Sequence, residues 1–424
     1  MMHPMLRPQT MTLTALLALL TAFGPISTDM YVPSMPDIGR QLGASLASVQ
    51  LTLSSYLAGF AIGQIIYGPI ADRFGRKPTL LTALVLFGVA SFICAIASTI
   101  EMLVIARAFQ ALGGAAAVML PRAVVRDLYT GERAGQELSR MGAIMSFAPV
   151  VAPLVGALVQ TELGWRATFV IIAAIGVVTT AMVWRALPET LPPDAAKPVK
   201  LAVMLRRYRA IVSNRAFLAH LGIIASSYAG LFAWISGSPF VLQDLYSLTP
   251  LWFGVAFAIA CVGSLVGAAA ASWLVMRIGL DRTIGLGTFV LAAGGLTMVA
   301  SLQLGLPPIM SLVLSMVIYH TGLMLAMPQS IAGALMPFPD CAGTASSVVG
   351  FTQQASAAAI GVLVGLMLGH SAWPLAVAIA AMGCLSLVIW AASRRIRAHA
   401  ISISEPERPH RHATALPAAQ PRVP

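Results

Sequence analysis

Residues 79–98 read TLLTALVLFGVASFICAIAS, a continuous apolar run without one charged side chain. A helix of this length rises about 30 Å at 1.5 Å per residue, which matches the hydrocarbon thickness of a bilayer. A strand that crossed a bilayer would instead alternate apolar and polar residues over about ten positions. The stretch therefore predicts a transmembrane helix.

The composition of the whole chain agrees with a membrane protein. Hydrophobic residues make up 58% of the 424 residues and charged residues only 10%, whereas soluble domains carry about 25% charged residues. The mean hydropathy is +0.84. A net charge of +11 would suit a nucleic-acid partner in a soluble protein, but in a membrane protein positive charge reports orientation. We therefore expect the lipid bilayer, and no nucleic acid, as a partner.

Similar apolar runs recur along the chain and predict an all-α membrane protein with twelve transmembrane helices. The predicted spans are 12–34, 46–69, 79–98, 102–122, 139–160, 167–187, 216–240, 249–275, 283–303, 307–330, 343–369 and 373–392. If both termini are cytoplasmic, the external loops hold only Arg40 and Arg166 of the 26 Lys and Arg residues, and Arg107 lies within a span. Because basic residues favour cytoplasmic loops, this asymmetry supports both the count and the orientation.

The spans divide into two halves of six. We expect an N-terminal six-helix bundle over 1–187, a cytoplasmic interdomain segment over 188–215, a C-terminal six-helix bundle over 216–392 and a disordered basic tail over 393–424. Within the interdomain segment, apolar residues between 201 and 212 share one helical face. That pattern predicts either a helix on the anionic cytoplasmic leaflet or an ordinary basic loop.

Two loops at matching places in the halves share an Arg-x-Gly sequence. Residues 68–78, GPIADRFGRKP, leave the second span, and residues 276–282, MRIGLDR, leave the eighth. Duplicated halves are typical of transporters, and the first loop resembles the signature between the second and third spans of the major facilitator superfamily. The resemblance implies a gating loop that latches the cytoplasmic side shut in one state, and the alternative is a charged turn needed only for topology. The residues concerned are Gly68, Asp72, Arg73, Gly75 and Arg76.

The fourth predicted span contains an arginine. Residues 107–114 read RAFQALGG, which places Arg107, Gln110 and Gly114 on one helical face. An arginine within hydrocarbon costs at least about 2.5 kcal/mol, so Arg107 is expected to face a cavity or a partner, unless it snorkels to the outer interface. The stretch resembles the Arg-x-x-Gln-Gly motif of proton-coupled members of the superfamily.

Asp29 is the one carboxylate predicted inside a span of the first half. It lies at a depth comparable to that of Arg107 and is therefore the natural partner of that arginine. Residues 28–36, TDMYVPSMP, resemble the first span of the bicyclomycin-resistance/CflA (Bcr/CflA) drug-efflux family. The alternative role for Asp29 is to cap a helix break before Pro33.

Other stretches carry the same resemblance, which covers roughly residues 10–392. Residues 148–157, APVVAPLVGA, are similar to the antiporter motif Gly-Pro-x-x-Gly-Gly, with close helix packing as the alternative role. The residues that match this motif are Pro149, Ala152, Pro153 and Gly156. Residues 121–129, PRAVVRDLY, and 338–347, FPDCAGTASS, match the Bcr/CflA family in particular.

The resemblance implies a monomeric, proton-coupled efflux antiporter of the bacterial inner membrane that exports small amphipathic drug-like molecules by alternating access. Asp29 would take a proton from outside and release it inside, beside Arg107. The alternatives are a proton-coupled exporter or symporter of a small metabolite (an amino acid or peptide) and a non-transporting membrane sensor. No nucleophile–base set or metal-ligand spacing occurs in the sequence, so we expect no enzyme, cofactor or metal site.

The substrate pocket is expected to be mostly apolar with a few polar anchors. The candidates from the predicted cavity-facing spans are Tyr31, Tyr56, Gln64, Gln110, Phe147, Trp234, Tyr319, His320 and Gln353. Three roles are open to His320: carrying a proton, donating a hydrogen bond to substrate, or capping a helix carbonyl. In the eleventh span, small residues recur on one face from Gly350 to Gly365 and predict close helix packing.

Overall fold

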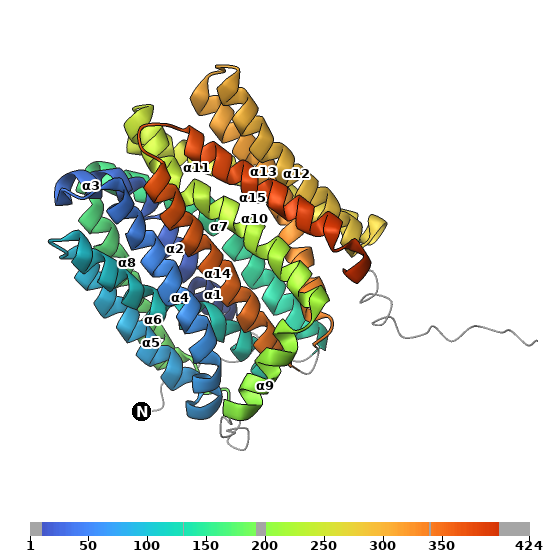
Figure 1. Cartoon of the computed structure of the whole chain (residues 1–424). Helices are drawn as coiled ribbons and strands as arrows, with labels where there is room; N and C mark the ends of the chain where they lie inside the picture. The colour runs from blue at the N-terminus through green and yellow to red at the C-terminus, as the bar shows by residue number, and fades with distance from the viewer. Residues whose placement is uncertain (1–10, 130, 192–200, 339–340, 398–424) are drawn as a thin grey trace, which may run out of the picture.

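The computed structural model describes residues 11–129, 131–191, 201–338 and 341–397, and within these ranges it is built from helices (Figure 1). The helices are α1 (Met11–Thr21), α2 (Phe23–Asp29), the 3₁₀ helix η1 (Val32–Ser34), α3 (Met35–Leu42), α4 (Leu46–Phe74), α5 (Arg76–Ala95), α6 (Ile100–Leu128), α7 (Gly131–Leu163), α8 (Trp165–Ala186), α9 (Leu201–Val212), α10 (Arg215–Pro239), the π-helix η3 (Phe240–Leu245), α11 (Pro250–Ile278), α12 (Leu280–Gln303), α13 (Pro308–Leu335), α14 (Ala342–Met367) and α15 (Trp373–Ala392).

Among the described helices, eleven are long and apolar enough to cross a membrane, and one bent helix pair brings the number up to twelve. This agrees with the predicted count. The first span extends beyond the predicted end at residue 34, and it is bent by 41° between Met11–Thr21 and Phe23–Leu42. Pro25, Pro33 and Pro36 lie in its second part, and each proline removes a backbone donor from the helix.

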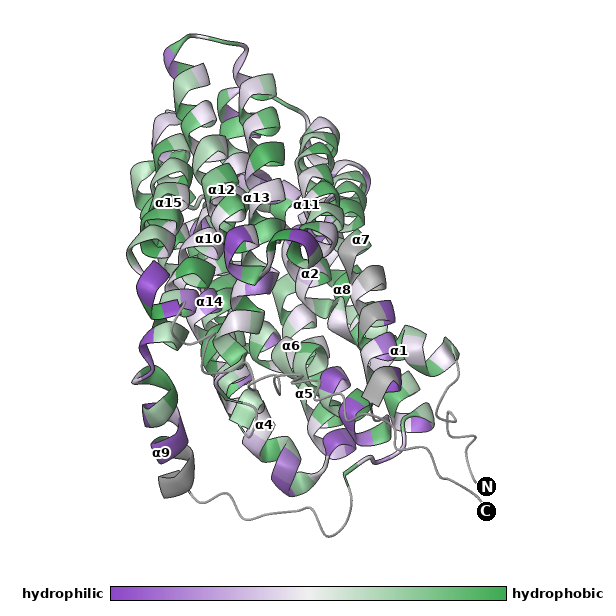
Figure 2. Ribbon diagram, turned by 90° about the vertical axis from the view of Figure 1, so that its right-hand side faces the viewer, coloured by the Kyte–Doolittle hydropathy of each residue, from purple (hydrophilic) through white to green (hydrophobic). Residues whose placement is uncertain are grey.

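Polar side chains begin several of the long helices. Ser45, Thr99, Asn214 and Thr249 each accept a hydrogen bond from a backbone N–H in the first turn of the helix that follows, as N-cap residues do. Apolar residues dominate the long helices beyond these ends, whereas hydrophilic residues are prominent on α9 (Figure 2). The helices therefore start where the chain leaves a polar layer and enters an apolar one.

We call α1–α8 the N-terminal set and α10–α15 the C-terminal set. In Figure 1 the blue-to-green helices and the yellow-to-red helices lie beside each other. The most extensive contacts between the sets are made by two helix pairs, α4 with α14 and α7 with α11. We call the region between these pairs the junction.

The α4–α14 pair confirms the packing face predicted in the eleventh span. A Cβ on Gly365 would overlap the side chain of Gln50, and one on Gly350 would overlap that of Gln64. On Gly361 it would come within 2.9 Å of Ser54 Oγ. Glycines of α14 thus accommodate polar side chains of α4, which lets the two helices approach closely.

The interdomain segment contains the helix predicted over 201–212. Ile211 of α9 is fully buried in a cluster with Phe217, whereas Leu205 and Val212 are exposed. Contact of α9 with the lipid leaflet stays a prediction. Residues 192–200 of this segment lie outside the described residues.

The predicted start of the disordered tail at 393 differs from the structure. Arg397 is fully buried, its Nε donates to Asp281 Oδ1 at 2.8 Å, and its Nη1 donates to Trp390 O at 2.8 Å and to the Ser393 hydroxyl. A buried guanidinium needs such partners, so the chain stays attached to the N-terminus of α12 up to this residue. Residues 398–424 lie outside the described residues.

Candidate functional site

Arg107 of α6 is fully buried, which rules out the snorkelling alternative. Its Nη1 donates to Ser27 O at 3.0 Å and to Gln110 Oε1 at 2.6 Å. Its guanidinium carbon also lies 4.6 Å from the ring centroid of Tyr31 and 4.2 Å from that of Tyr56. Each such cation–π contact contributes about 2 kcal/mol when it is shielded from water. Hydrogen bonds and ring contacts together therefore hold a charge in the apolar interior.

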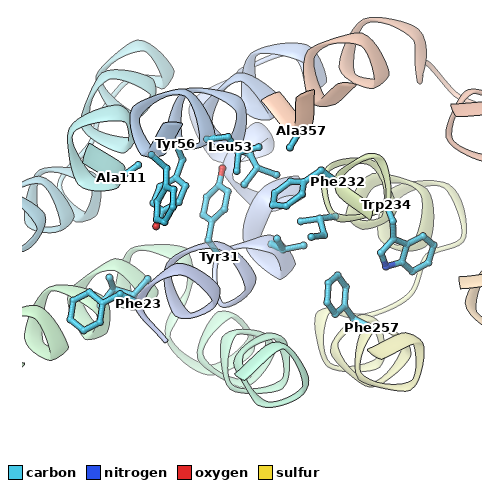
Figure 3. Packing of buried hydrophobic residues seen from close by; sticks show 14 of the residues in the cluster. Phe23, Tyr31, Leu53, Tyr56, Ala111, Phe232, Trp234, Phe257 and Ala357 are labelled. Carbon is cyan, nitrogen blue, oxygen red and sulfur yellow. The ribbon is translucent and has the colours of Figure 1, made fainter. Parts of the chain in front are cut away.

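Gln110 and Tyr31 extend this polar cluster into the N-terminal set. Gln110 Nε2 donates to Ser91 Oγ at 2.8 Å, and the Tyr31 hydroxyl is hydrogen-bonded to the Thr52 hydroxyl. The predicted shared face of Arg107 and Gln110 is confirmed by their direct hydrogen bond. Figure 3 shows Tyr31 and Tyr56 on the side of the N-terminal set, opposite Phe232 and Trp234.

Asp29 ends α2 and is 6% exposed. Thr28 Oγ1 donates to Asp29 Oδ1 at 2.9 Å, and no ion pair joins Asp29 to Arg107 among the described residues. The predicted direct partnership is therefore not formed here, because Arg107 is bonded to the Ser27 carbonyl and to Gln110 instead. The ring of Tyr56 faces the Arg107 guanidinium, and its hydroxyl is also within electrostatic range of Asp29.

Asp29 also lies within electrostatic reach of residues from the other set. These are Tyr228 of α10 and Cys261 of α11. The sequence prediction included neither residue. The ring of Tyr228 lies 4.8 Å from that of Phe232, between centroids, one helical turn along the chain. The sequence signal that could have indicated Tyr228 is the pair of aromatic residues Tyr228 and Phe232, four positions apart in the seventh span.

The antiporter motif packs against the chain that follows Asp29. A Cβ on Gly156 would overlap Met30 O, so α7 and the break in the first span touch backbone to backbone. The same motif reaches the C-terminal set, because the Cys261 thiol donates to Pro149 O at 3.5 Å, and a Cβ on Gly254 would come within 3.2 Å of Pro153 O. Ala152 is buried between these contacts in the motif. This geometry supports the packing role, and a coupling role stays a prediction.

The gating loop forms a network of ion pairs in the N-terminal set. Arg76 Nη1 lies 2.5 Å from Asp72 Oδ1, and Arg76 Nε lies 3.0 Å from Asp127 Oδ2. Arg73 instead lies over the ring of its neighbour Phe74, 5.1 Å from the centroid. Gly75 connects α4 and α5 at a φ of +99°, a conformation that glycine adopts without strain.

Sequence reasoning missed Glu189 in this network. Its carboxylate accepts the backbone N–H of Arg76 at 2.9 Å and of Lys77 at 3.1 Å, at the N-terminus of α5. Burial alone would raise the pKa of the Glu189 carboxyl, but these two donors and the N–H groups of Thr190 and Leu191 outweigh it and lower that pKa. The available signal was an acidic residue directly after the sixth span, which could cap a neighbouring helix.

The other pocket candidates do not gather around Asp29. Tyr319 donates to Ser227 O at 3.1 Å, and His320 Nδ1 lies 3.0 Å from Met316 O, so both lie within the packing of the C-terminal set. The helix-capping role of His320 is thus the one the geometry favours. Trp234 is fully buried and its Nε1 has no hydrogen-bond partner among the described residues.

The remaining candidates have diverse surroundings. Gln64 faces Gly350 of α14. Gln353 lies beside Tyr228, with which its side chain interacts. Phe147 is 60% exposed. The structure therefore brings Asp29, Tyr31, Tyr56, Arg107 and Gln110 into one region and places Gln353 beside it through Tyr228, whereas the other candidates are dispersed.

Comparisons with known proteins agree with a transporter. The family model described as Major Facilitator Superfamily matches residues 17–362. A Bacillus subtilis (strain 168) protein described as uncharacterized MFS-type transporter YdgK is 30% identical over 86% of this chain and 91% of its own length. The bicyclomycin resistance protein homolog of Haemophilus influenzae is 27% identical over 88% of this chain and 94% of its own length. Multidrug resistance protein D of Escherichia coli (strain K12) is 27% identical over 91% of this chain and 96% of its own length.

A solved structure shares the fold. The crystal structure of the peptide transporter POT in complex with sulfate superposes with a TM-score of 0.74 at 16% identity, over 94% of this chain and 97% of the other. At that identity the likeness concerns the fold alone. The family match over residues 17–362 and the relative that is 30% identical show that the chain is a membrane transporter and not an enzyme, and that it belongs to the Major Facilitator Superfamily.

Proposed function

We propose that this transporter is a proton-coupled antiporter of the bacterial inner membrane, with cytoplasmic termini, that exports small amphipathic drug-like molecules. The observation that carries the proposal is the position of Asp29. It is a buried carboxylate at the end of α2, which packs against α6 and α7, and the η1 break that follows it contacts α10 and α11 of the other set. Among the described residues it forms no ion pair. The charge of such a group depends strongly on its access to water, and that access changes if the two sets rock against each other.

Arg107 supports this role from behind Tyr56. Its charge is held by the Ser27 carbonyl, Gln110 and aromatic rings, so it persists whether or not Asp29 is protonated. Deprotonated Asp29 would be attracted towards the Arg107 charge, and protonated Asp29 would not. Protonation and deprotonation of Asp29 can thus change the packing of the first span against α6.

The driving force is sufficient for efflux. One proton that crosses roughly 150 mV supplies about 3.5 kcal/mol. This free energy sustains a substrate gradient of about a few hundredfold. Such a gradient would lower the cytoplasmic concentration of a drug substantially.

The contacts between the sets support an inward-facing state. The polar contacts that cross the junction near its outer end include Gln50 with Ser236 and Arg40 with Asp244. The gating loop at the opposite end makes its ion pairs with Asp72 and Asp127, inside the N-terminal set. This is the arrangement expected when the predicted cytoplasmic latch is open.

The surroundings of Asp29 suit an amphipathic cargo. Tyr56, Tyr228 and Phe232 supply aromatic surface close to a single carboxylate, and such surfaces bind flat apolar groups. Two of the relatives are named for resistance to bicyclomycin and to multiple drugs. We therefore propose a drug-like molecule that contacts this aromatic cluster, rather than an amino acid or peptide.

Proton release from inverted membrane vesicles tests the coupling. Vesicles with an acidic interior would contain the wild type, Asp29→Asn or the control Glu101→Gln, whose carboxylate is exposed at the start of α6. Addition of bicyclomycin should release protons from vesicles with the wild type and the control, and not from those with Asp29→Asn. Unchanged release with Asp29→Asn would refute the coupling role, and increased drug accumulation in expressing cells would indicate import instead of efflux.

A further inference from the structure

An ion pair bridges the two sets at the outer end of the junction. Arg40 at the end of α3 places its Nη1 2.9 Å from Asp244 Oδ1 in η3, and its Nη2 3.7 Å from Asp37 Oδ1. The side chains of Arg40 and Asp244 are 61% and 45% exposed. The pair is therefore accessible to water and is weak by itself.

A second polar contact crosses the junction deeper inside. Gln50 of α4 is fully buried, and its Nε2 donates to Ser236 O of α10 at 2.9 Å. At the end of α10 the backbone N–H of Phe240 donates to Gly237 O and not to Ser236 O, which leaves the Ser236 carbonyl available to Gln50. Gly365 of α14 leaves space for the glutamine side chain. Because this contact is shielded from water, breaking it costs more than breaking the exposed pair.

The ion pair borders a cavity. The cavity, of about 520 Å³, is lined by both sets, with Arg40, Val49 and Leu46 on one side and Phe240, Val241 and Asp244 on the other, and with His370 from the loop before α15. Packing is therefore incomplete beside the ion pair, and the polar contacts that cross the junction contribute to closure there.

A third contact links the ion pair to the proton site. Gln243, next to Asp244 in η3, donates from Nε2 to Pro33 O at 3.1 Å. Pro33 belongs to η1, the break that directly follows Asp29 in the first span. Movement of η3 away from α3 must therefore either break this hydrogen bond or shift the backbone that follows Asp29.

We propose that Arg40–Asp244 and Gln50–Ser236 form the outer gate of this transporter, and that Gln243 connects this gate to Asp29. The inference rests on the alternating access in the proposed function. Both gate contacts hold the outer side closed in the present state, and both must break before external water reaches Asp29. Arg40, Gln50, Gln243 and Asp244 are thus positioning residues for the transport cycle.

Thiol labelling tests the gate without requiring drug or proton. In a background where Cys94, Cys261, Cys341 and Cys384 are replaced by alanine, Val49→Cys places a single thiol on the wall of the outer cavity. We expect Arg40→Ala and Asp244→Ala to raise the labelling rate by a membrane-impermeant maleimide up to about fivefold. Gln50→Ala should raise it about tenfold, because its contact is buried.

Three comparisons separate a gate from a general loosening of the fold. The double variant Arg40→Ala/Asp244→Ala should label no faster than either single variant, and the exchange Arg40→Asp/Asp244→Arg should restore slow labelling. Arg166→Ala is the matched control, because Arg166 is also an exposed arginine at the outer end, but it bonds to Gln41 and Ala97 within its own set. Equal effects of Arg166→Ala and Arg40→Ala, or additive effects of the two single variants, would overturn the proposal.

The same labelling distinguishes this inference from the proposed function. If gate variants leave labelling unchanged while Asp29→Asn abolishes proton release, the gate is wrong and the proton coupling stands. If gate variants accelerate labelling while Asp29→Asn still releases protons, the gate stands and the coupling role of Asp29 is wrong. A Gln243→Ala variant that slows proton release while Val49→Cys labelling stays slow would support the link to Asp29, and normal release would overturn that link.

Discussion

Arg107 shows at the level of one residue how a charge is tolerated inside an apolar bundle. Its guanidinium combines two hydrogen bonds with contacts to the faces of Tyr31 and Tyr56. A planar, delocalised cation can satisfy both requirements at once, because it donates in its plane and stacks on its faces. A lysine ammonium has neither the plane nor the reach.

Arg107→Lys is therefore expected to impair transport although it keeps the charge. Loss of one charge-assisted hydrogen bond costs about 1.5–3 kcal/mol, so the drug-efflux rate should fall about tenfold to a hundredfold. Efflux of a fluorescent drug from loaded cells measures this rate. Arg166→Lys, at an exposed arginine, should retain normal efflux, and equal losses in the two variants would contradict the special role of Arg107.

At the level of elements, the start of α5 is determined by contacts between three segments. Gly75 turns the chain between α4 and α5, and the Glu189 carboxylate from beyond α8 caps the first N–H groups of α5. Arg76 connects the same turn to Asp127 at the end of α6. The gating loop is therefore attached to three helices of one set.

Two glycine substitutions in this loop should have opposite effects. Gly75→Ala imposes a side chain at a positive φ, 2.5 Å from Glu189 Oε2, and should lower the free energy of unfolding by at least about 1–2 kcal/mol. Gly68→Ala lies within α4, where a Cβ meets nothing within 4 Å, and should be neutral or gain up to about 1 kcal/mol. Thermal unfolding in detergent compares them, and a destabilised Gly68→Ala would contradict this account.

Glu189→Gln should reveal a pH-dependent part of the stability. The pKa of Glu189 is lowered from its ordinary value of 4.5 in the folded protein, so its stabilising contribution is complete above that value. The contribution is lost as the pH falls through the lower pKa of the folded state. The wild type should therefore unfold at a higher temperature than Glu189→Gln at pH 7, and the difference should shrink below about pH 4. A difference that grew on acidification would show that the sign is wrong.

At the level of the whole molecule, the two sets meet along α4–α14 and α7–α11. Glycines and small residues line these pairs, so the helices approach closely. Polar contacts between the sets include Gln50 with Ser236 of α10 and Cys261 with Pro149, and the buried apolar residues of both sets form one continuous cluster. The first span, which carries Asp29, packs against α7, and its η1 break contacts α7 and α11.

Thiol labelling in spheroplasts checks the orientation of the whole bundle. In the cysteine-free background, Ser247→Cys lies between η3 and α11 and Ser213→Cys between α9 and α10, and both serines are exposed. The loop charges predict that only Ser247→Cys reacts with an impermeant maleimide before permeabilisation. The reverse pattern would place the termini outside and invert the proposed direction of transport.

The sequence alone was enough to predict the helical spans, their number and the membrane setting. Hydrophobicity and helix length are properties of each segment by itself, so they can be read without knowing the neighbours. The same holds for the shared face of Arg107 and Gln110, which one helix determines. The matched Arg-x-Gly loops likewise indicated two halves.

Only the tertiary structure decided which side chains meet. Depth along each span suggested that Asp29 pairs with Arg107, but the structure bonds Arg107 to Ser27 O and Gln110, and it brings the break that follows Asp29 into contact with α10 and α11. Glu189 reaches α5, and Gln50 reaches Ser236, from segments far apart in the chain. Such contacts depend on the relative positions of whole helices, to which many residues contribute, and no local pattern records them.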